Sequence, residues 1–300
     1  MTVAATAPVV ERTASDAFTP TDWAIFTSIA AIWGASFLFI AVGLESLEPG
    51  VVTLLRVGLG ASILNVLPGG RTRIQPADRS RLVAVSIIWV GLPFTLFPIA
   101  EQHINSAITG LLNGATPMFV AMFGALFFGR RTNGAQLVGV AVGFAGVVLI
   151  STPSLGEGST QALGVGLVLL ATVCYGLATN LVVPLQVRYG SRVVMARMLA
   201  LATLWTLPFG VAGLADSRIE AGPIAAVAVL GLVGTGLAFL LMGSLVGRVG
   251  ATRASFITYL IPVAALALGV VFQDDHVAAP ALIGVVLVVV GAILAGRREA

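Results

Sequence analysis

Ten stretches of about 20 mostly apolar residues run through this sequence, and each is long enough to cross the hydrocarbon core of a membrane as a helix. By number they are approximately 23–43, 51–67, 82–100, 104–128, 135–151, 163–184, 192–214, 222–245, 252–272 and 279–296. The connections between them are too short to hold a soluble domain. Only 10% of the residues are charged, against about 25% in soluble proteins. The sequence therefore predicts an all-α integral membrane protein with ten transmembrane helices.

The arginines lie almost entirely on one side of this predicted bundle. The even-numbered connections and the two tails hold Arg12, Arg71, Arg73, Arg79, Arg81, Arg130, Arg131, Arg188, Arg192, Arg248, Arg253, Arg297 and Arg298. The opposite connections hold only Arg218, together with eight acidic residues. Because cytoplasmic loops are enriched in arginine, this split predicts a multi-pass protein of the plasma (inner) membrane with both termini in the cytoplasm. The arginines form no single basic face, so we expect no nucleic-acid partner.

The two halves of the chain repeat each other weakly. A shift of 145 residues aligns Pro117 with Pro262, and a shift of 142 brings WGASF (33–37) onto YGLAT (175–179). Each half holds five segments, and because five is odd the second half enters the membrane from the opposite side. We predict two inverted five-helix repeats, at 23–151 and 163–296, with a linker at 152–162, a disordered cytoplasmic tail at 1–22 and a cytoplasmic tail at 297–300.

Several of these segments resemble a known family. WGASF (33–37), the arginine of the second segment, TPMFVAMFGALFFG (116–129) followed by QLVGVAVGFAGVVLI (136–150), and IPVAALALGVVF (261–272) followed by ALIGVVLVVVGAILA (281–295) look like the two EamA repeats of the drug/metabolite transporter superfamily. The resemblance covers roughly residues 24–296. It implies a ten-helix inner-membrane carrier, most often an exporter of amino acids, related metabolites or small drugs.

The chain departs from this family at one motif. The resemblance implies a Gly-Glu pair at the end of the fourth and ninth helices, where this sequence has GRR (129–131) and DDH (274–276). Asp275 keeps an acid at the expected place and Arg130 does not. A role for paired acids is therefore left open, with ordinary loop charges as the alternative.

Polar residues share one face of the fourth and ninth segments, close to a proline. At about 100° per residue these are Ser106, Thr109, Asn113 and Thr116 in the fourth, and Thr252, Ser255, Thr258 and Tyr259 in the ninth. Pro117 and Pro262 cannot donate to the carbonyls four residues back, so both are candidate hinges beside free acceptors. A polar stripe facing lipid would be costly. We predict that the stripes line a central solute cavity; the alternative is hydrogen bonding between helices.

Four further residues are candidates for contact with the solute. Trp33 and Tyr175 are equivalent under the repeat and lie near segment centres, where they can stack on an amphipathic solute or pack in the core. Asn180 follows Tyr175 by about one and a half turns. Arg56 lies well within the second segment and can bind a substrate carboxylate; a structural ion pair or snorkelling to the interface is the alternative.

Acidic residues and histidines are absent from the segment centres. Glu101 and His103 fall at an outer boundary, so the sequence predicts no buried proton relay and leaves the coupling mechanism open. One cysteine, two histidines and the lack of an H-E-x-x-H motif predict no catalytic residue, no cofactor and no metal site.

Together these patterns predict a secondary transporter rather than an enzyme. Its expected activity is efflux of small amphipathic metabolites, amino-acid-like, or of drugs, by alternating access. The alternatives are an integral membrane enzyme and a non-catalytic receptor or assembly subunit. The expected partners are a small-molecule solute and the lipid bilayer. A homodimer is allowed but not required, since the spacings Gly139–Gly143 and Gly243–Gly247 are interpreted as contacts inside the bundle.

Overall fold

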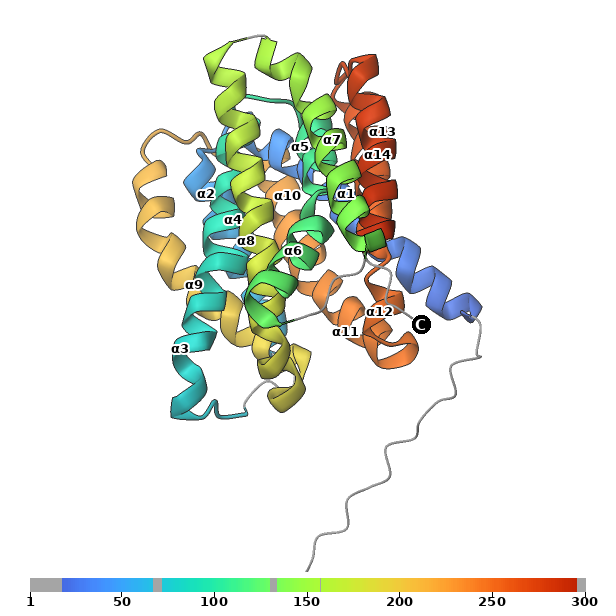
Figure 1. The fold of residues 1–300 in the computed structure, drawn as a ribbon. Coiled ribbons are helices and arrows are strands. Elements are labelled where there is room, and N and C mark those ends of the chain that lie inside the picture. The colour runs from blue at the N-terminus through green and yellow to red at the C-terminus, as the bar shows by residue number, and fades with distance from the viewer. Residues whose placement is uncertain (1–17, 67–71, 130–133, 157, 296–300) are drawn as a thin grey trace, which may run out of the picture.

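A computed structural model gives the structure of residues 18–66, 72–129, 134–156 and 158–295 (Figure 1). Within these ranges all regular structure is helical. Residues 1–17 of the predicted N-terminal tail, Arg130 and the predicted tail at 297–300 lie outside the described residues.

The helices follow the apolar segments closely. The first half of the chain forms α1 (Pro20–Leu44), α2 (Pro49–Val66), α3 (Pro76–Val85), the π-helix η1 (Ser86–Gly91), α4 (Leu92–Glu101), α5 (Ser106–Asn113), α6 (Thr116–Phe128) and α7 (Gly134–Gly156). The second half forms α8 (Ser159–Tyr189), α9 (Ser191–Gly213), α10 (Ala221–Val229), the π-helix η2 (Leu230–Leu237), α11 (Ala238–Val249), α12 (Ala251–Ala254), α13 (Ile257–Phe272) and α14 (Ala279–Ala295). A π-helix thus interrupts the third and the eighth predicted segments, at corresponding places of the two halves.

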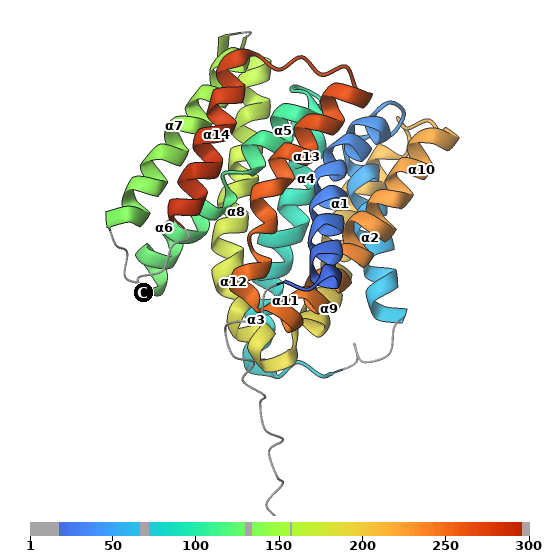
Figure 2. The same cartoon turned by 90° about the vertical axis from the view of Figure 1, so that its right-hand side faces the viewer.

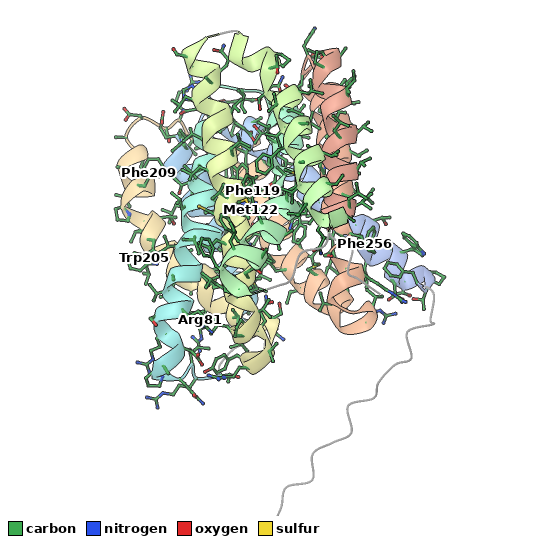
Figure 3. All side chains as sticks on the ribbon, viewed as in Figure 1. Arg81, Phe119, Met122, Trp205, Phe209 and Phe256 are labelled. Carbon is green, nitrogen blue, oxygen red and sulfur yellow. The ribbon has the colours of Figure 1, made fainter. Side chains whose placement is uncertain are left out.

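The lengths and the surface of these helices identify a multi-pass membrane protein. Within the described residues, eight spans are long and apolar enough to cross a membrane, and Ile257–Phe272 and Ala279–Leu294 are shorter apolar helices. Large apolar side chains point outward from the bundle, such as Trp205 and Phe209 on α9 (Figure 3). Lipid tails solvate such a surface, whereas water would not. The number of ten crossings stays a prediction.

Two helices extend beyond their apolar segments, and in α1 polar residues account for this. α1 begins at Pro20 rather than at residue 23, since Thr19 Oγ1 accepts from Asp22 N at 3.3 Å and Asp22 Oδ2 accepts from Thr19 N at 2.9 Å. This reciprocal capping box satisfies backbone donors of the first turn. Most of the predicted linker at 152–162 is helical, since α7 continues to Gly156 and α8 begins at Ser159.

The central helices of each half pack mainly against helices of the other half. In the first half, α1 packs against α13, α10, η2 and α11 of the second half; α8 of the second half packs against α6, α4, η1 and α3 of the first. α2 pairs with α9, and α7 pairs with α14, which lie side by side at one edge of the bundle in both views (Figures 1 and 2). The interior of the protein therefore lies between the halves rather than within either one.

The contact between α7 and α14 depends on glycine. A Cβ atom at Gly291 would lie 2.5 Å from the carbonyl oxygen of Gly139 and against the backbone of Gly143. Backbone cannot move aside as a flexible side chain can, so the helices could not approach this closely with a larger residue. The interpretation of Gly139 and Gly143 as contacts inside the bundle is confirmed. A Cβ at Gly243 or Gly247 would meet nothing within 4 Å, so the interpretation of this second pair as a close contact inside the bundle is wrong.

Candidate functional site

Arg56 lies in the interior, where α2 meets α4 and η2. Its side chain is 6% exposed; Nε donates to Thr235 Oγ1 at 3.3 Å, and Cζ lies 3.8 Å from the centroid of the Phe94 ring. A cation over an aromatic face is attracted by the quadrupole of the ring. None of the ion pairs between described residues includes Arg56. A hydroxyl and a ring are weak partners for a buried guanidinium, which can therefore still bind a carboxylate.

Two irregular stretches of backbone border Arg56, one in α4 and one in η2. Pro98 has no N–H, which leaves the carbonyl of Phe94 free, and Thr53 Oγ1 donates to that carbonyl at 2.9 Å. This bond ties α2 to α4 one turn from Arg56. On the other side, Thr235 Oγ1 donates to Leu230 O at 3.2 Å, five residues back, as the wider turn of η2 permits. Such π-helical turns are frequent at functional sites.

Trp33 and Tyr175 occupy equivalent positions in the two halves. Trp33 on α1 is half-buried and packs edge-on against Phe239 of α11, with ring centroids 6.0 Å apart. Tyr175 on α8 is half-buried, and its ring centroid lies 5.9 Å from that of Phe97 on α4. Each aromatic side chain thus reaches from one half of the protein to the other. Stacking on a solute stays a prediction for both.

The fourth predicted segment consists of two helices. α5 ends at Asn113 and α6 begins at Thr116, with Gly114 and Ala115 forming a turn between them. The carbonyl of Asn113, which Pro117 leaves free, accepts from Thr116 Oγ1 at 2.9 Å. We expected this acceptor to be available to a ligand, and the chain itself occupies it. Asn113 remains half-buried at the break.

The remaining hydroxyls of the fourth segment are buried and paired. Thr109 Oγ1 donates to Asn105 O at 3.0 Å, and Ser106 Oγ donates to Asp275 Oδ2 at 2.7 Å. The Thr109 bond stays within the first turn of α5, whereas the Ser106 bond joins α5 to the connection between α13 and α14. Their place beside a solute path stays a prediction.

The ninth predicted segment is broken before its proline. α12 ends at Ala254 and α13 begins at Ile257, whereas Pro262 lies buried inside α13. Ser255 is exposed at the break, and Thr258 Oγ1 donates to its carbonyl at 2.8 Å. Tyr259 OH donates to Ala292 O of α14 at 2.9 Å. Because Pro117 follows one break and Pro262 lies beyond the other, their role as hinges stays a prediction.

Asn180 connects two helices of different halves. Its Nδ2 donates to Val120 O of α6 at 3.0 Å and to Gly176 O at 2.9 Å. Its Oδ1 is buried and has no hydrogen-bond partner among the described residues. The amide group therefore holds α8 against α6 while one acceptor remains open.

Glu101 is a candidate that the sequence did not single out. It is the last residue of α4, and both carboxylate oxygens are buried with no hydrogen-bond partner among the described residues. An ionisable side chain buried within a membrane protein indicates a functional site by default. A signal was present in the spacing, since Glu101 follows Phe94 by two helical turns and so lies on the face that meets Arg56.

Asp275 joins the two halves at the end of the bundle where α4 ends and α5 begins. Its Oδ2 accepts from Ser106 Oγ at 2.7 Å and from Ala107 N at 2.9 Å, so it caps the N-terminus of α5 from the other half. Beside it, Asn105 Nδ2 donates to His276 O at 3.2 Å. We call these contacts the outer clasp, because the arginine distribution predicts that this end faces outward.

At the opposite end, arginines pair with acids across the halves. Arg248 of α11 pairs with Asp22 of α1, and Arg188 of α8 pairs with Asp78 of α3. Tyr189 OH also donates to Asp78, at 2.6 Å. These contacts join α1 to α11 and α3 to α8, which are helices of different halves that also pack against each other.

Two cavities open at opposite ends of the bundle. One of 420 Å³ lies between the start of α9 and α11 and is lined by Arg192, Phe239 and Ser244 among others. Within the described chain, two guanidinium nitrogens of Arg192 have no hydrogen-bond partner although they are buried.

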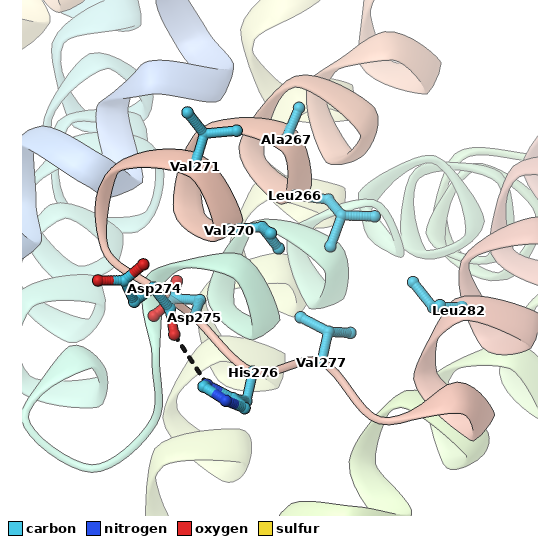
Figure 4. Close-up of a pocket in the computed structure, with 9 residues that line it drawn as sticks. All are labelled: Leu266, Ala267, Val270, Val271, Asp274, Asp275, His276, Val277 and Leu282. Atoms are coloured by element: carbon cyan, nitrogen blue, oxygen red, sulfur yellow. Dashed lines mark hydrogen bonds between the residues drawn. The ribbon is translucent and has the colours of Figure 1, made fainter.

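The other cavity, of 630 Å³, lies between the outer ends of α13 and α14 (Figure 4). Valines and leucines line most of it, with Asp274, Asp275 and His276 at its rim, where His276 Nδ1 lies 2.9 Å from Asp274 O. No predicted site residue lines it.

The described residues contain no group of three His, Cys, Asp or Glu side chains that could hold a metal ion. The arrangement around Arg56 instead offers a cation, hydroxyls, aromatic faces and a buried acid. Such a set suits an organic solute with a carboxylate and an apolar part.

A family profile and a relative of similar length both match this chain. The profile of the EamA-like transporter family matches residues 21–152 and again 162–297. An uncharacterized transporter of Archaeoglobus fulgidus is 24% identical over 277 residues, which cover 92% of this chain and 99% of that protein.

Two relatives carry more specific names. A probable terminal-alkyne amino-acid exporter of Streptantibioticus cattleyicolor is 26% identical over 92% of this chain and 93% of its own. A probable amino-acid metabolite efflux pump of Escherichia coli is 26% identical over 88% of this chain and 90% of its own. A crystal structure described only as that of a protein matches with a TM-score of 0.65 at 19% identity, over 92% of this chain and 96% of that one, which supports the fold alone.

Proposed function

This chain belongs to the EamA-like transporter family, and on that premise we propose that it exports a small amphipathic solute, amino-acid-like or drug-like, across the plasma membrane by alternating access. The two relatives named as an amino-acid exporter and an amino-acid metabolite efflux pump support the solute class. In this proposal the family's two matched regions are inverted repeats of five crossings each. The arginine distribution supports cytoplasmic termini.

Arg56 is the observation that carries the solute class. The buried guanidinium of Arg56, paired only with a hydroxyl and a ring among the described residues, suits one carboxylate and not a multiply charged phosphate. Tyr175, Trp33 and the phenylalanines around them can cover an apolar side chain. The polar stripes would then border the path between the halves.

The 420 Å³ cavity supports a route from the cytoplasm in this proposal. It lies at the end where the arginines gather, and its lining includes Phe239, which packs on Trp33. Arg192, buried in the same lining, would attract an anionic group at the entrance. A solute would pass from Arg192 past Phe239 and Trp33 toward Arg56.

Uptake by inside-out membrane vesicles tests the proposal. Vesicles from overproducing cells should accumulate a radiolabelled mixture of neutral L-amino acids, and Arg56→Gln should lower that uptake roughly 10- to 150-fold, the loss of one charge-assisted hydrogen-bonded pair. Arg56→Lys should retain part of it. Arg218→Gln, at a side chain that is 76% exposed, is the matched control and should behave as wild type. Wild-type vesicles that accumulate none of the mixture, or an unimpaired Arg56→Gln variant, would contradict the proposal.

A further inference from the structure

Glu101 occupies an environment that disfavours an isolated negative charge. Both of its carboxylate oxygens are buried, and no described residue hydrogen-bonds to them. Removing an ionised carboxylate from water without a partner costs several kcal/mol, so such a group binds a proton or a cation instead. Its place at the C-terminus of α4 adds to this, because the negative end of the helix dipole lies there.

Arg56 and Glu101 are directed toward each other. α2 and α4 are antiparallel neighbours, and the bond from Thr53 to the Phe94 carbonyl fixes their alignment. Side chains on a helix lean toward its N-terminus, so Arg56 leans toward the outer end and Glu101 leans back toward Phe94. Glu101 lies two turns, or about 10 Å, beyond Phe94 along the helix axis. No ion pair between described residues joins the two groups.

Few other titratable groups face Glu101. Asp275 acts on it from the connection between α13 and α14, but Oδ2 of that residue already accepts two hydrogen bonds from α5. Tyr175 on α8 packs against Phe97, and His103 lies in the following connection. The other elements packed on α4 are η1, α5 and α1, and they carry no Asp, Glu, His, Lys or Arg apart from Asp22 at the far end of α1.

We propose that Glu101 binds the ammonium group of an α-amino acid whose carboxylate binds Arg56, and that a proton occupies Glu101 when the solute is absent. This proposal rests on the proposed export function and names both its substrate class and its coupling. A zwitterion presents one negative and one positive group, and Arg56 and Glu101 offer a buried cation and a buried acid that no ion pair joins to each other.

The exchange is balanced in atoms and charge. The entering ammonium group stays protonated and forms an ion pair with the Glu101 carboxylate, and the proton that leaves Glu101 passes to water. When the amino acid leaves, a proton from water binds to Glu101 again. Because solute and proton compete for one carboxylate, an inward proton gradient drives the solute outward.

Proton release by purified protein tests this competition directly. Adding an equimolar mixture of neutral L-amino acids to weakly buffered wild-type protein should release about one proton per bound amino acid, and the apparent affinity should fall about tenfold per unit of decreasing pH. Glu101→Gln should release none and lose the pH dependence. Glu101→Asp retains the acid and should retain the release. Glu45→Gln, at an exposed acid on the same predicted face, is the matched control.

Infrared spectra give a readout that needs no solute. Solute-free wild-type protein should show the carbonyl stretch of a protonated carboxylic acid at neutral pH, absent from Glu101→Gln and present in Glu45→Gln. Absence of that band from wild-type protein, or its persistence in Glu101→Gln, overturns the proposal.

Thermal stabilisation by the same mixture separates failure of this proposal from failure of the export function. If the mixture stabilises wild-type protein without releasing protons, Glu101 has no such role while amino-acid binding stands. If the mixture neither stabilises the protein nor enters inside-out vesicles, the proposed solute class is wrong, and the role of Glu101 in binding it is wrong as well.

Discussion

Replacing Asp275 by alanine should open the outer end of the protein. Asp275 is the residue by which the connection between α13 and α14 holds the N-terminus of α5, and its Oδ2 accepts from Ser106 Oγ and Ala107 N. The substitution removes both bonds and the negative charge next to the positive end of the α5 dipole. Only the Asn105–His276 contact of the outer clasp then remains.

The size of the effect follows from the two hydrogen bonds. Hydrogen bonds to a charged group contribute about 1.5–3 kcal/mol each, and water replaces part of this when the clasp opens. A loss of about 2–4 kcal/mol changes the ratio of open to closed protein roughly 30- to 900-fold. Asp274→Asn is the matched control, because this neighbouring acid is exposed and its positive φ of 52° suits asparagine.

A buried reporter measures the opening. Thr109 on α5 has no exposed surface, so a Thr109→Cys substitution in a Cys174→Ala background should react only slowly with a membrane-impermeant thiol reagent added to intact cells. Asp275→Ala should raise this rate by at least about 30-fold, the lower end of the range set by the lost bonds. Asp274→Asn should leave it unchanged.

A second reporter separates gate opening from local fraying of α5. Ser244 lines the cavity at the predicted cytoplasmic end. In alternating access that end closes when the outer end opens, so Ser244→Cys should react more slowly in inside-out vesicles once Asp275 is replaced. Unchanged labelling of Thr109→Cys in folded Asp275→Ala protein would refute the gating role. Faster labelling at Thr109 with no change at Ser244 would show that Asp275 only caps α5 and does not control the opening of the outer end.

Three further predictions concern topology, packing and the solute path. A cysteine at Arg73 should be shielded from an impermeant thiol reagent in intact cells and one at Glu48 labelled, and the opposite pattern would contradict the inverted repeat. Gly291→Ala should destabilise the α7–α14 contact by about 1–3 kcal/mol and lower the Tm by several degrees, because its Cβ meets backbone; Gly166→Ala, whose Cβ meets nothing within 4 Å, should not. Trp33→Ala should abolish resistance to toxic amino-acid analogues at unchanged membrane abundance, and retained resistance would assign Trp33 to the core.

The positions of the helices and the buried arginine could be predicted from the sequence, because lipid imposes strong and simple requirements. A crossing needs about 20 apolar residues and internally satisfied backbone, so helix positions can be predicted from hydropathy. A buried arginine is costly enough to be informative by itself, and Arg56 is indeed interior. The glycine spacing at Gly139 and Gly143 also had a direct structural meaning, since only a small residue permits backbone contact.

Hydrogen-bond partners between distant segments could not be predicted in the same way. Pro117 frees a carbonyl as expected, but the hydroxyl of Thr116 fills it; Pro98 frees another, and Thr53 of a different helix fills that one. The sequence tells which acceptor is free, whereas the packing of helices decides which donor reaches it. The capping of α5 by Asp275, 168 residues away along the chain from Ala107, depends on the same packing.

Glu101 illustrates why burial at a helix end cannot be predicted from distance along the helix alone. Its position near the predicted outer boundary indicates a solvated residue, and an isolated helix would leave it in water. In the folded chain α8 passes over this end, and a Cβ at Gly164 would lie within 3.1 Å of the Ala100 carbonyl oxygen and 3.0 Å of the His103 side chain. Glycine at that position lets α8 approach the backbone next to Glu101 closely. The surroundings of Glu101 at this helix end therefore depend on a glycine 63 positions away, which the hydropathy of α4 alone does not reveal.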